Sequence, residues 1–237
     1  MDAVASFRLA VIEFQTLSEV LHEDVNLSRK AYFDAPSQTA ARTLIRSVFA
    51  LLEGQTYRLK QWALARYRQT GQITDAGELT LLEEVAFDLN DKGKITRRNA
   101  RIRTGANVRF AFEAIARAHG YRYEFDANEL GWGAFNQALA TRHRLTHPKS
   151  ANDLHVEGDE VIVALAAVEW FQHSSMSLLI EAVRVMSSHD STLMADLQKF
   201  ESRWKESSKE SRDLLMSDRT KRPTTRSTTT SQKRPAG

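Results

Sequence analysis

The sequence predicts an all-α protein, an up-and-down bundle of four to five principal helices with helical additions at both ends. Apolar residues recur three and four positions apart through most of the chain, as they do on one face of an α-helix. Segments containing proline or glycine interrupt this periodicity. Hydrophobic residues make up 42% of the 237 residues, which supports a sizeable core.

The first half of the chain divides into four expected helices. The apolar pattern predicts amphipathic helices over residues 3–26 and 37–68, separated by a break at residues 34–37 that contains Pro36. The sequence Thr70-Gly71 is a typical helix end. Further helices are expected over residues 76–89 and 105–119, with a turn at residues 90–93 between them and Gly120 as the second stop.

The next helix is expected from residue 127 to about residue 146. Asp126, with Glu129 three residues later, predicts an N-cap and a capping box. Gly131 and Gly133 lie near the helix start, where each costs on the order of 1 kcal/mol, so they indicate close packing or fraying. A polar loop over residues 149–158, with a short strand at residues 154–156, then leads to a helix over residues 159–187.

These elements suggest four parts of the chain. Residues 1–35 form an N-terminal helix that packs on the bundle, residues 36–190 form the bundle, residues 191–217 form a C-terminal helix, and residues 218–237 form a disordered basic tail.

The net charge of +3 comes from the tail, because residues 219–237 hold six Lys or Arg and no acid, whereas residues 1–218 carry a net charge of −3. Any surface that attracts a polyanion in the folded part must therefore be local.

The most basic stretch of the body follows the turn at residues 90–93. It contains no acid before Glu113, and its cations are Lys92, Lys94, Arg97, Arg98, Arg101, Arg103 and Arg109. One interpretation is a solvated connector between helices, and the other is a rim that contacts RNA phosphates. No aromatic residue occurs in it before Phe110, so the stretch offers no base-stacking platform of its own.

An unusual group of side chains ends the helix expected at residues 127–146, in the sequence Arg142-His143-Arg144-Leu145-Thr146-His147-Pro148-Lys149. Phe135, Leu139 and Arg142 share one helix face, so a guanidinium lies where apolar residues point. Such a charge is costly unless it is paired or meets water and a ligand. Pro148 disfavours the α conformation at His147, which places this imidazole at the helix end beside the arginine.

This pattern resembles the R-x(4–6)-H motif of the HEPN domain family, in which a polar residue follows the arginine; the matching positions are Arg142, His143 and His147. The resemblance implies a metal-independent endoribonuclease that needs no cofactor. His147 would act as general acid or base, Arg142 would stabilise the phosphoryl charge, and His143 would position the phosphate or tune Arg142. It further implies an RNA substrate, a homodimer and a cytoplasmic toxin or antiviral defence effector, with an antitoxin protein as the partner in the case of a toxin–antitoxin system.

Other residues could support this chemistry. Arg144 should face away from Arg142, because two positions separate them on the helix. We assign the candidate RNA-binding set as Arg144, Lys149, Arg97, Arg98, Arg101 and Arg103, and the candidate carboxylates that support the motif as Glu53 and Glu169.

Two alternatives to a ribonuclease remain open at this stage. In the first, His147 is an ordinary helix cap and Arg142 pairs with a carboxylate such as Glu53 or Glu169, so that the chain is a catalytically inactive interaction or RNA-binding module. In the second, His143 and His147, four residues apart, bind a metal with His155. Because Arg stands at position 144, where a zinc protease has Glu, we expect no metal site.

Several function classes are excluded by what the sequence lacks. The chain has no cysteine, which rules out disulfides, thiolate zinc sites and cysteine nucleophiles. It has no glycine-rich phosphate loop and no Gly-x-Ser-x-Gly elbow. No signal peptide is expected, since Arg8 and Glu13 interrupt the first apolar residues. The longest apolar run, residues 161–168, is far shorter than the roughly 20 residues that a membrane span needs.

Overall fold

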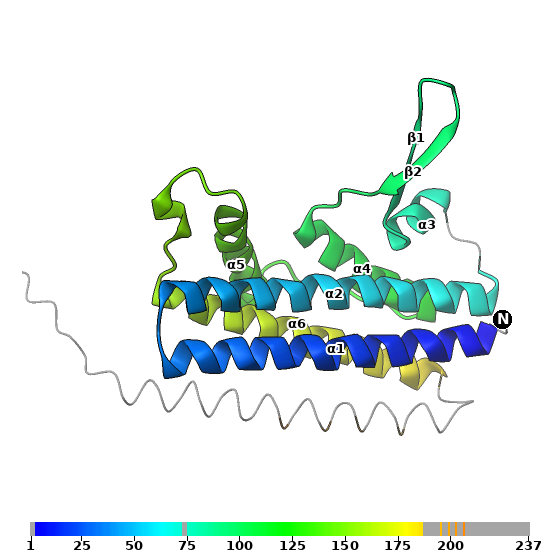
Figure 1. Cartoon of the computed structure of the whole chain (residues 1–237). Helices are drawn as coiled ribbons and strands as arrows, with labels where there is room; N and C mark the ends of the chain where they lie inside the picture. The colour runs from blue at the N-terminus through cyan, green and yellow to red at the C-terminus, as the bar shows by residue number, and fades with distance from the viewer. Residues whose placement is uncertain are drawn as a thin grey trace, which may run out of the picture. The chain divides into compact units, whose positions relative to one another are not determined.

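The computed structural model describes residues 3–72 and 75–186, together with the single positions 195, 199, 202 and 206. The chain divides into two compact units, Met1–Leu197 and Gln198–Gly237, and every helix and strand named below belongs to the first. The predicted all-α helical bundle is confirmed, with one small two-stranded sheet added to it (Figure 1). The C-terminal helix and the basic tail that we predicted lie outside the described residues, apart from these single positions.

Helices α1 (Ala3–Asp34) and α2 (Gln38–Thr70) form a long antiparallel pair (Figure 1). Helix α1 continues well beyond the end that we predicted and stops at the expected break. The Ser37 side chain caps α2 by accepting a hydrogen bond from the backbone N–H of Ala40 at 3.1 Å. Gly71 ends α2 in the left-handed conformation, with φ of 68°. Large apolar side chains of α2, among them Leu44, Ile45, Val48, Leu52 and Trp62, are fully buried.

Residues 76–89 are not one helix, and that prediction was wrong. Helix α3 (Ala76–Leu82) is short, Glu84 follows it with φ of 53°, and strand β1 (Val85–Leu89) then pairs antiparallel with strand β2 (Ile95–Asn99). The predicted turn is the loop of this hairpin, in which the Asn90 side chain accepts from the backbone N–H groups of Lys92 and Lys94. The apolar residues of β1 suit either a helix or a strand, and the cross-strand pairing decides between them. The hairpin projects from the helices as an arm (Figure 1).

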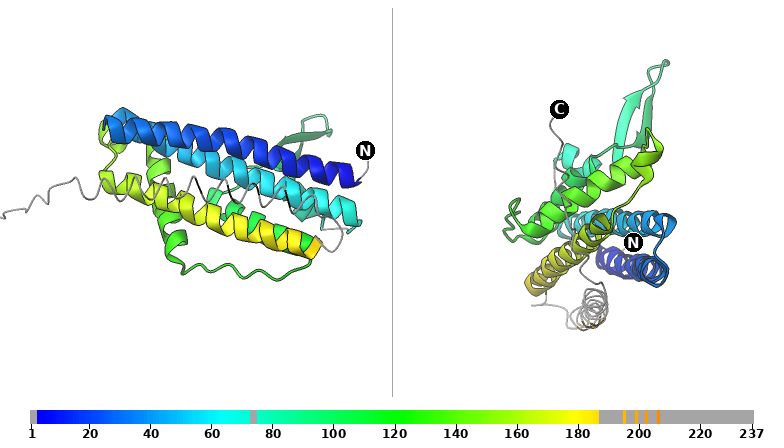
Figure 2. Two further views of the ribbon diagram at one scale, coloured as in Figure 1. Left: turned by 90° about the horizontal axis from the view of Figure 1, so that it is seen from below. Right: turned by 90° about the vertical axis from the view of Figure 1, so that its left-hand side faces the viewer.

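Three further helices complete the described part of the bundle: α4 (Thr104–His119), α5 (Leu130–Thr146) and α6 (Gly158–Met186). Helix α6 runs alongside α1 and α2 (Figure 2). Helix α5 crosses them, so that it is seen nearly end-on in Figure 1. Gly120 ends α4, as predicted, and adopts the left-handed conformation. An aromatic cluster joins α4, α5 and α6; its members are Phe112, Phe125, Trp132, Phe135, Trp170 and Phe171.

Two local predictions around α5 were wrong. Helix α5 begins at Leu130, and the Asp126 side chain accepts from the backbone N–H of Asn128 in a turn before the helix. The carboxylate of Glu129 accepts from Trp170 Nε1 at 2.7 Å, so this side chain serves tertiary packing rather than a capping box. After α5 the chain forms a 3₁₀ helix, η1 (Ala151–Leu154), in place of the strand that we expected at residues 154–156.

The structure contains no helix that is long and apolar enough to cross a membrane within the residues that it describes.

A buried histidine makes the stability of this unit depend on pH. His119 is only 3% exposed, and burial lowers its pKa to about 4, although the hydrogen bond to the Ile115 carbonyl works in the opposite direction and the Arg66 charge adds to the lowering. The unfolded chain therefore takes up this proton near pH 6.5, while the folded protein takes it up only near pH 4. Because the unfolded state binds more protons in this interval, stability falls as the pH falls.

Lowering the pH from 7 to 5 is expected to cost about 2 kcal/mol of unfolding free energy through His119. Urea denaturation of the wild type and of His119→Gln at both pH values measures this contribution. The variant, whatever its stability at pH 7, should lose about 2 kcal/mol less than the wild type on acidification. Equal losses in the two proteins would show that His119 titrates normally in the folded state.

Candidate functional site

An open hollow of about 1040 Å³ lies where the end of α5, the middle of α2, the start of α4 and residues 100–103 meet. We call it the motif hollow, because Arg142, His143 and His147 all line it. The other polar residues of its wall are Glu53, Thr56, Glu84, Arg101, Arg103, Thr104, Asn107 and Asn136. Trp132 and Leu139 add apolar surface.

Arg142 reaches the motif hollow from the inward face of α5, as the helix periodicity predicted. On the same face Phe135 and Ala138 are fully buried, and this packing fixes the rotation of the helix. The Arg142 side chain is 26% exposed, and its Nη2 lies 2.9 Å from Oε1 of Glu53 on α2, whose side chain is 41% exposed. Glu53 also accepts a hydrogen bond from Thr104 Oγ1 at 3.4 Å. The guanidinium is thus paired, yet it remains accessible from the hollow.

The two motif histidines line the same hollow. Both side chains are exposed. His147 ends α5 with φ of −127° and ψ of 57°, which confirms that Pro148 moves this residue out of the α conformation. Its backbone N–H still donates to the His143 carbonyl at 3.0 Å, so a helical hydrogen bond holds the backbone of the residue that carries the imidazole.

Arg144 points away from Arg142, as expected, and its guanidinium is hydrogen-bonded within the fold. It donates to the carbonyls of Asp153 and His155 at 2.7 and 2.5 Å and to both carboxylate oxygens of Glu160 at 2.6 and 2.8 Å. Partial burial works to raise the pKa of Glu160, but the bonds from Arg144, the Glu157 N–H and Thr141 outweigh it and lower that pKa. Arg144 therefore ties the loop after the motif to α6.

A buried lysine fixes the base of the hairpin beside the motif hollow. Lys60 of α2 is fully buried, and its Nζ donates to Oε1 of Glu84 at 2.5 Å, to Oδ1 of Asn107 at 2.8 Å and to the Leu81 carbonyl at 3.2 Å. Burial lowers the pKa of Lys60, while the contact with Glu84 opposes that shift. All three donor positions of the ammonium are used, which is what a buried charge requires.

The other predicted residues are distributed around this site. Arg101 and Arg103 line the motif hollow, and within the described part of the chain neither has a carboxylate at ion-pair distance. Arg97 and Arg98 lie outside it, on β2, at 3.8 Å from Glu83 and Asp88. Two more predicted residues are also outside the hollow: Lys149 is exposed just after the motif, and Glu169 is half-buried on α6.

The alternative metal site finds no support in the geometry. Among the residues that the structure describes, no group of three or more His, Asp or Glu side chains could hold a metal ion. The third ligand proposed for that site, His155, lies outside the motif hollow, with its Nε2 3.1 Å from Oε1 of Glu157.

Several residues of the motif hollow could not be found from the motif alone. Asn136 and Trp132 lie about two and three turns before Arg142 on α5, and Thr104 and Asn107 come from the first turn of α4. A usable signal was the spacing on the helix, because Leu139 lies three residues before Arg142 and Asn136 lies seven residues before His143.

No family model, curated protein or solved structure matches this chain.

Proposed function

We propose that this protein is a HEPN-like, metal-independent endoribonuclease whose active site is the motif hollow. The observation that carries the proposal is that Arg142, His143 and His147 line one open hollow together with Arg101 and Arg103. An accessible guanidinium beside imidazoles suits phosphodiester chemistry, because arginine binds phosphoryl oxygens and histidine transfers protons near neutral pH.

The proposed reaction is an internal transfer within the RNA. The ribose 2′-OH loses its proton to an imidazole, and its oxygen attacks the adjacent phosphorus. The bond from phosphorus to the 5′ oxygen of the next nucleotide breaks, and that oxygen takes up a proton. The products are a 2′,3′-cyclic phosphate and a free 5′-OH. His147 supplies one of the two proton transfers, and Arg142 stabilises the additional negative charge on the phosphoryl oxygens.

Arg142 can serve this role although it is paired with Glu53. Both side chains are partly exposed, and ion pairs of this kind contribute about 0–1 kcal/mol. An RNA phosphate that entered the hollow would therefore compete with Glu53 at little cost. His143, one position after Arg142 and exposed on the same wall, would hold the phosphate or orient the guanidinium.

The resemblance to HEPN proteins adds the biological setting to this proposal. The active form is a homodimer, in which His147 of the partner subunit supplies the second proton transfer. The protein acts on RNA in the cytoplasm as a toxin or defence effector, and an antitoxin protein is the expected partner if it is a toxin.

The pair formed by Arg142 and Glu53 also favours a second candidate function. If this pair only joins α5 to α2, the chain is a catalytically inactive bundle that serves as an interaction or RNA-binding module. The two candidates differ in what they require of Glu53, because the inactive module needs both members of the pair, whereas the ribonuclease needs Arg142 alone.

Arg142→Ala and Glu53→Gln separate these candidates in one assay. For the ribonuclease, Arg142→Ala should lower the cleavage of total RNA in excess EDTA by about 100-fold, the loss typical of one charge-stabilising donor, and Glu53→Gln should retain most of the activity. Both variants should keep their stability within about 1 kcal/mol. If wild-type protein cuts no RNA and both variants lower the melting temperature equally, the inactive module is the correct assignment.

A further inference from the structure

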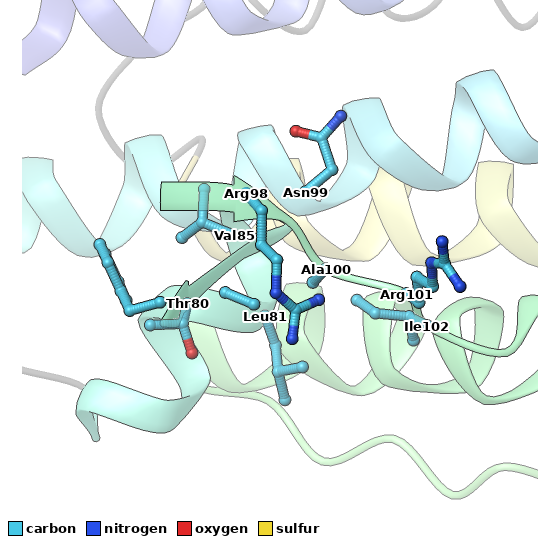
Figure 3. A pocket seen from close by; sticks show the side chains of 10 residues that line it. Thr80, Leu81, Val85, Arg98, Asn99, Ala100, Arg101 and Ile102 are labelled. Carbon is cyan, nitrogen blue, oxygen red and sulfur yellow. The ribbon is translucent and has the colours of Figure 1, made fainter. Parts of the chain in front are cut away.

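A second hollow, of about 1090 Å³, lies beside the base of the hairpin and against α3 (Figure 3). We call it the hairpin hollow. Its wall includes Thr80 and Leu81 of α3, Phe87 of β1 and Arg98 of β2. In Figure 3 the Arg98 side chain extends across the middle of this wall, whereas the guanidinium of Arg101 points away from it.

The hairpin hollow and the motif hollow adjoin each other. Residues 100–102, a short segment that includes Arg101, line both of them. A strand of RNA that ran from the motif hollow into the hairpin hollow would pass this segment and meet Phe87. The proposal that follows rests on the function proposed for the motif hollow.

The hairpin combines a basic ribbon with exposed apolar side chains. Residues 85–103 contain six Lys or Arg and two Asp, and the strand register places Phe87 directly opposite Arg97. Phe87 is 57% exposed, and Leu89 and Ile95 nearer the tip are more exposed still. Cations beside an accessible aromatic ring are the usual components of a surface for unpaired nucleotides, because every base has a face that stacks. The basic stretch itself has no aromatic residue before Phe110, but the hairpin brings Phe87 of β1 opposite it.

We propose that the hairpin hollow is a second nucleotide-binding site, which holds an unpaired nucleotide of the RNA next to the cleaved bond. Phe87 stacks on its base, and Arg97, which lies opposite Phe87 on the same face of the hairpin, and Arg101 bind the phosphates on either side of it. The contact between Arg97 and Glu83 is long, at 3.8 Å, and the Arg97 side chain is largely exposed, so it does not hold Arg97 back. A base inside a duplex is stacked on its neighbours and cannot reach the ring, so the site selects single-stranded RNA.

The test measures binding separately from cleavage. The probe is a fluorescent 12-nucleotide 2′-O-methyl RNA, which cannot be cut through its 2′-OH, and the full-length chain is titrated into it while anisotropy is recorded. Phe87→Ala should raise the Kd about tenfold, in line with the loss of one stacked base. Phe87→Trp should bind at least as tightly as the wild type, and Ile95→Ala, an exposed apolar residue outside the hollow, should change the Kd less than twofold. A 12-base-pair duplex should bind more weakly than the single strand.

The outcomes distinguish this proposal from that for the motif hollow. If Phe87→Ala raises the Kd while the wild type cuts no RNA in any assay, the nucleotide site stands and the ribonuclease assignment falls. If the wild type cuts RNA while Phe87→Ala binds and cuts as the wild type does, the nucleotide site falls and the ribonuclease stands. If Phe87→Ala leaves the Kd unchanged and instead dissociates an oligomer in sedimentation, the hairpin is a protein interface and the nucleotide site is refuted.

Discussion

His147→Ala is expected to lower the rate of RNA cleavage by about 10²–10⁴-fold, the range that general acid–base catalysis contributes. The same change should alter the unfolding free energy by no more than about 0.5 kcal/mol, since the imidazole is exposed at the end of α5. Initial rates on a labelled RNA, measured in excess EDTA alongside the thermal midpoint of each protein, give both quantities.

His155→Ala is the matched control for this substitution. His155 is also an exposed histidine in the same part of the chain, but it lies outside the motif hollow and pairs with Glu157. It should retain the wild-type cleavage rate. A His147→Ala protein that cuts as fast as the wild type, or a His155→Ala protein that loses as much, would remove His147 from the mechanism.

The largest effect on stability is expected from Gly131→Ala. A Cβ atom at this position would lie 2.1 Å from Cδ1 and 2.2 Å from Cγ of Trp170, far inside van der Waals contact. Trp170 cannot move freely, because it is buried in the aromatic cluster and its Nε1 donates to Glu129. We expect a loss of about 3 kcal/mol, near the upper end for overpacking, and a thermal midpoint lower by roughly 6–12 °C.

Gly133→Ala, two residues later on the same helix, is the matched control. In the part of the chain that the structure describes, no neighbouring atom lies within 4 Å of a Cβ built at Gly133. The substitution should therefore stabilise α5 by up to about 1 kcal/mol through helix propensity. Urea denaturation of both variants compares the two positions directly. Similar free energies for the two proteins would mean that α5 does not pack on Trp170 as closely as the structure indicates.

Three helix ends were predictable from sequence because their chemistry is local. Ser37, Gly71 and Gly120 each act on the backbone within a few residues, so they mark the same boundaries in any tertiary context. The hairpin was not predictable in this way. The apolar residues from Leu79 to Leu89 fit a helix repeat, and only the pairing with residues 95–99 and the anchoring of Glu84 by Lys60 select the strand.

In the candidate site, too, the features set by local sequence were predictable and those set by tertiary contacts were not. The positions of Arg142 and His147 at one helix end followed from the periodicity of α5 and from Pro148, and both residues line the same hollow. Glu53 was one of two carboxylates considered as the partner of Arg142, and the distance between helices α2 and α5 decided between them. Phe87 was missed altogether, because its approach to the basic stretch depends on strand pairing.

The central claim is that RNA is cleaved in the motif hollow by attack of the RNA's own 2′-OH, without a metal ion. Its most direct test uses one RNA oligonucleotide that the wild type cuts, and the same oligonucleotide with a single 2′-deoxy nucleotide before the cleaved bond, both in excess EDTA. The account predicts that the first is cut to a 2′,3′-cyclic phosphate and that the second stays intact at that bond. Equal cutting of both, or cutting only after Mg²⁺ is added, would contradict it.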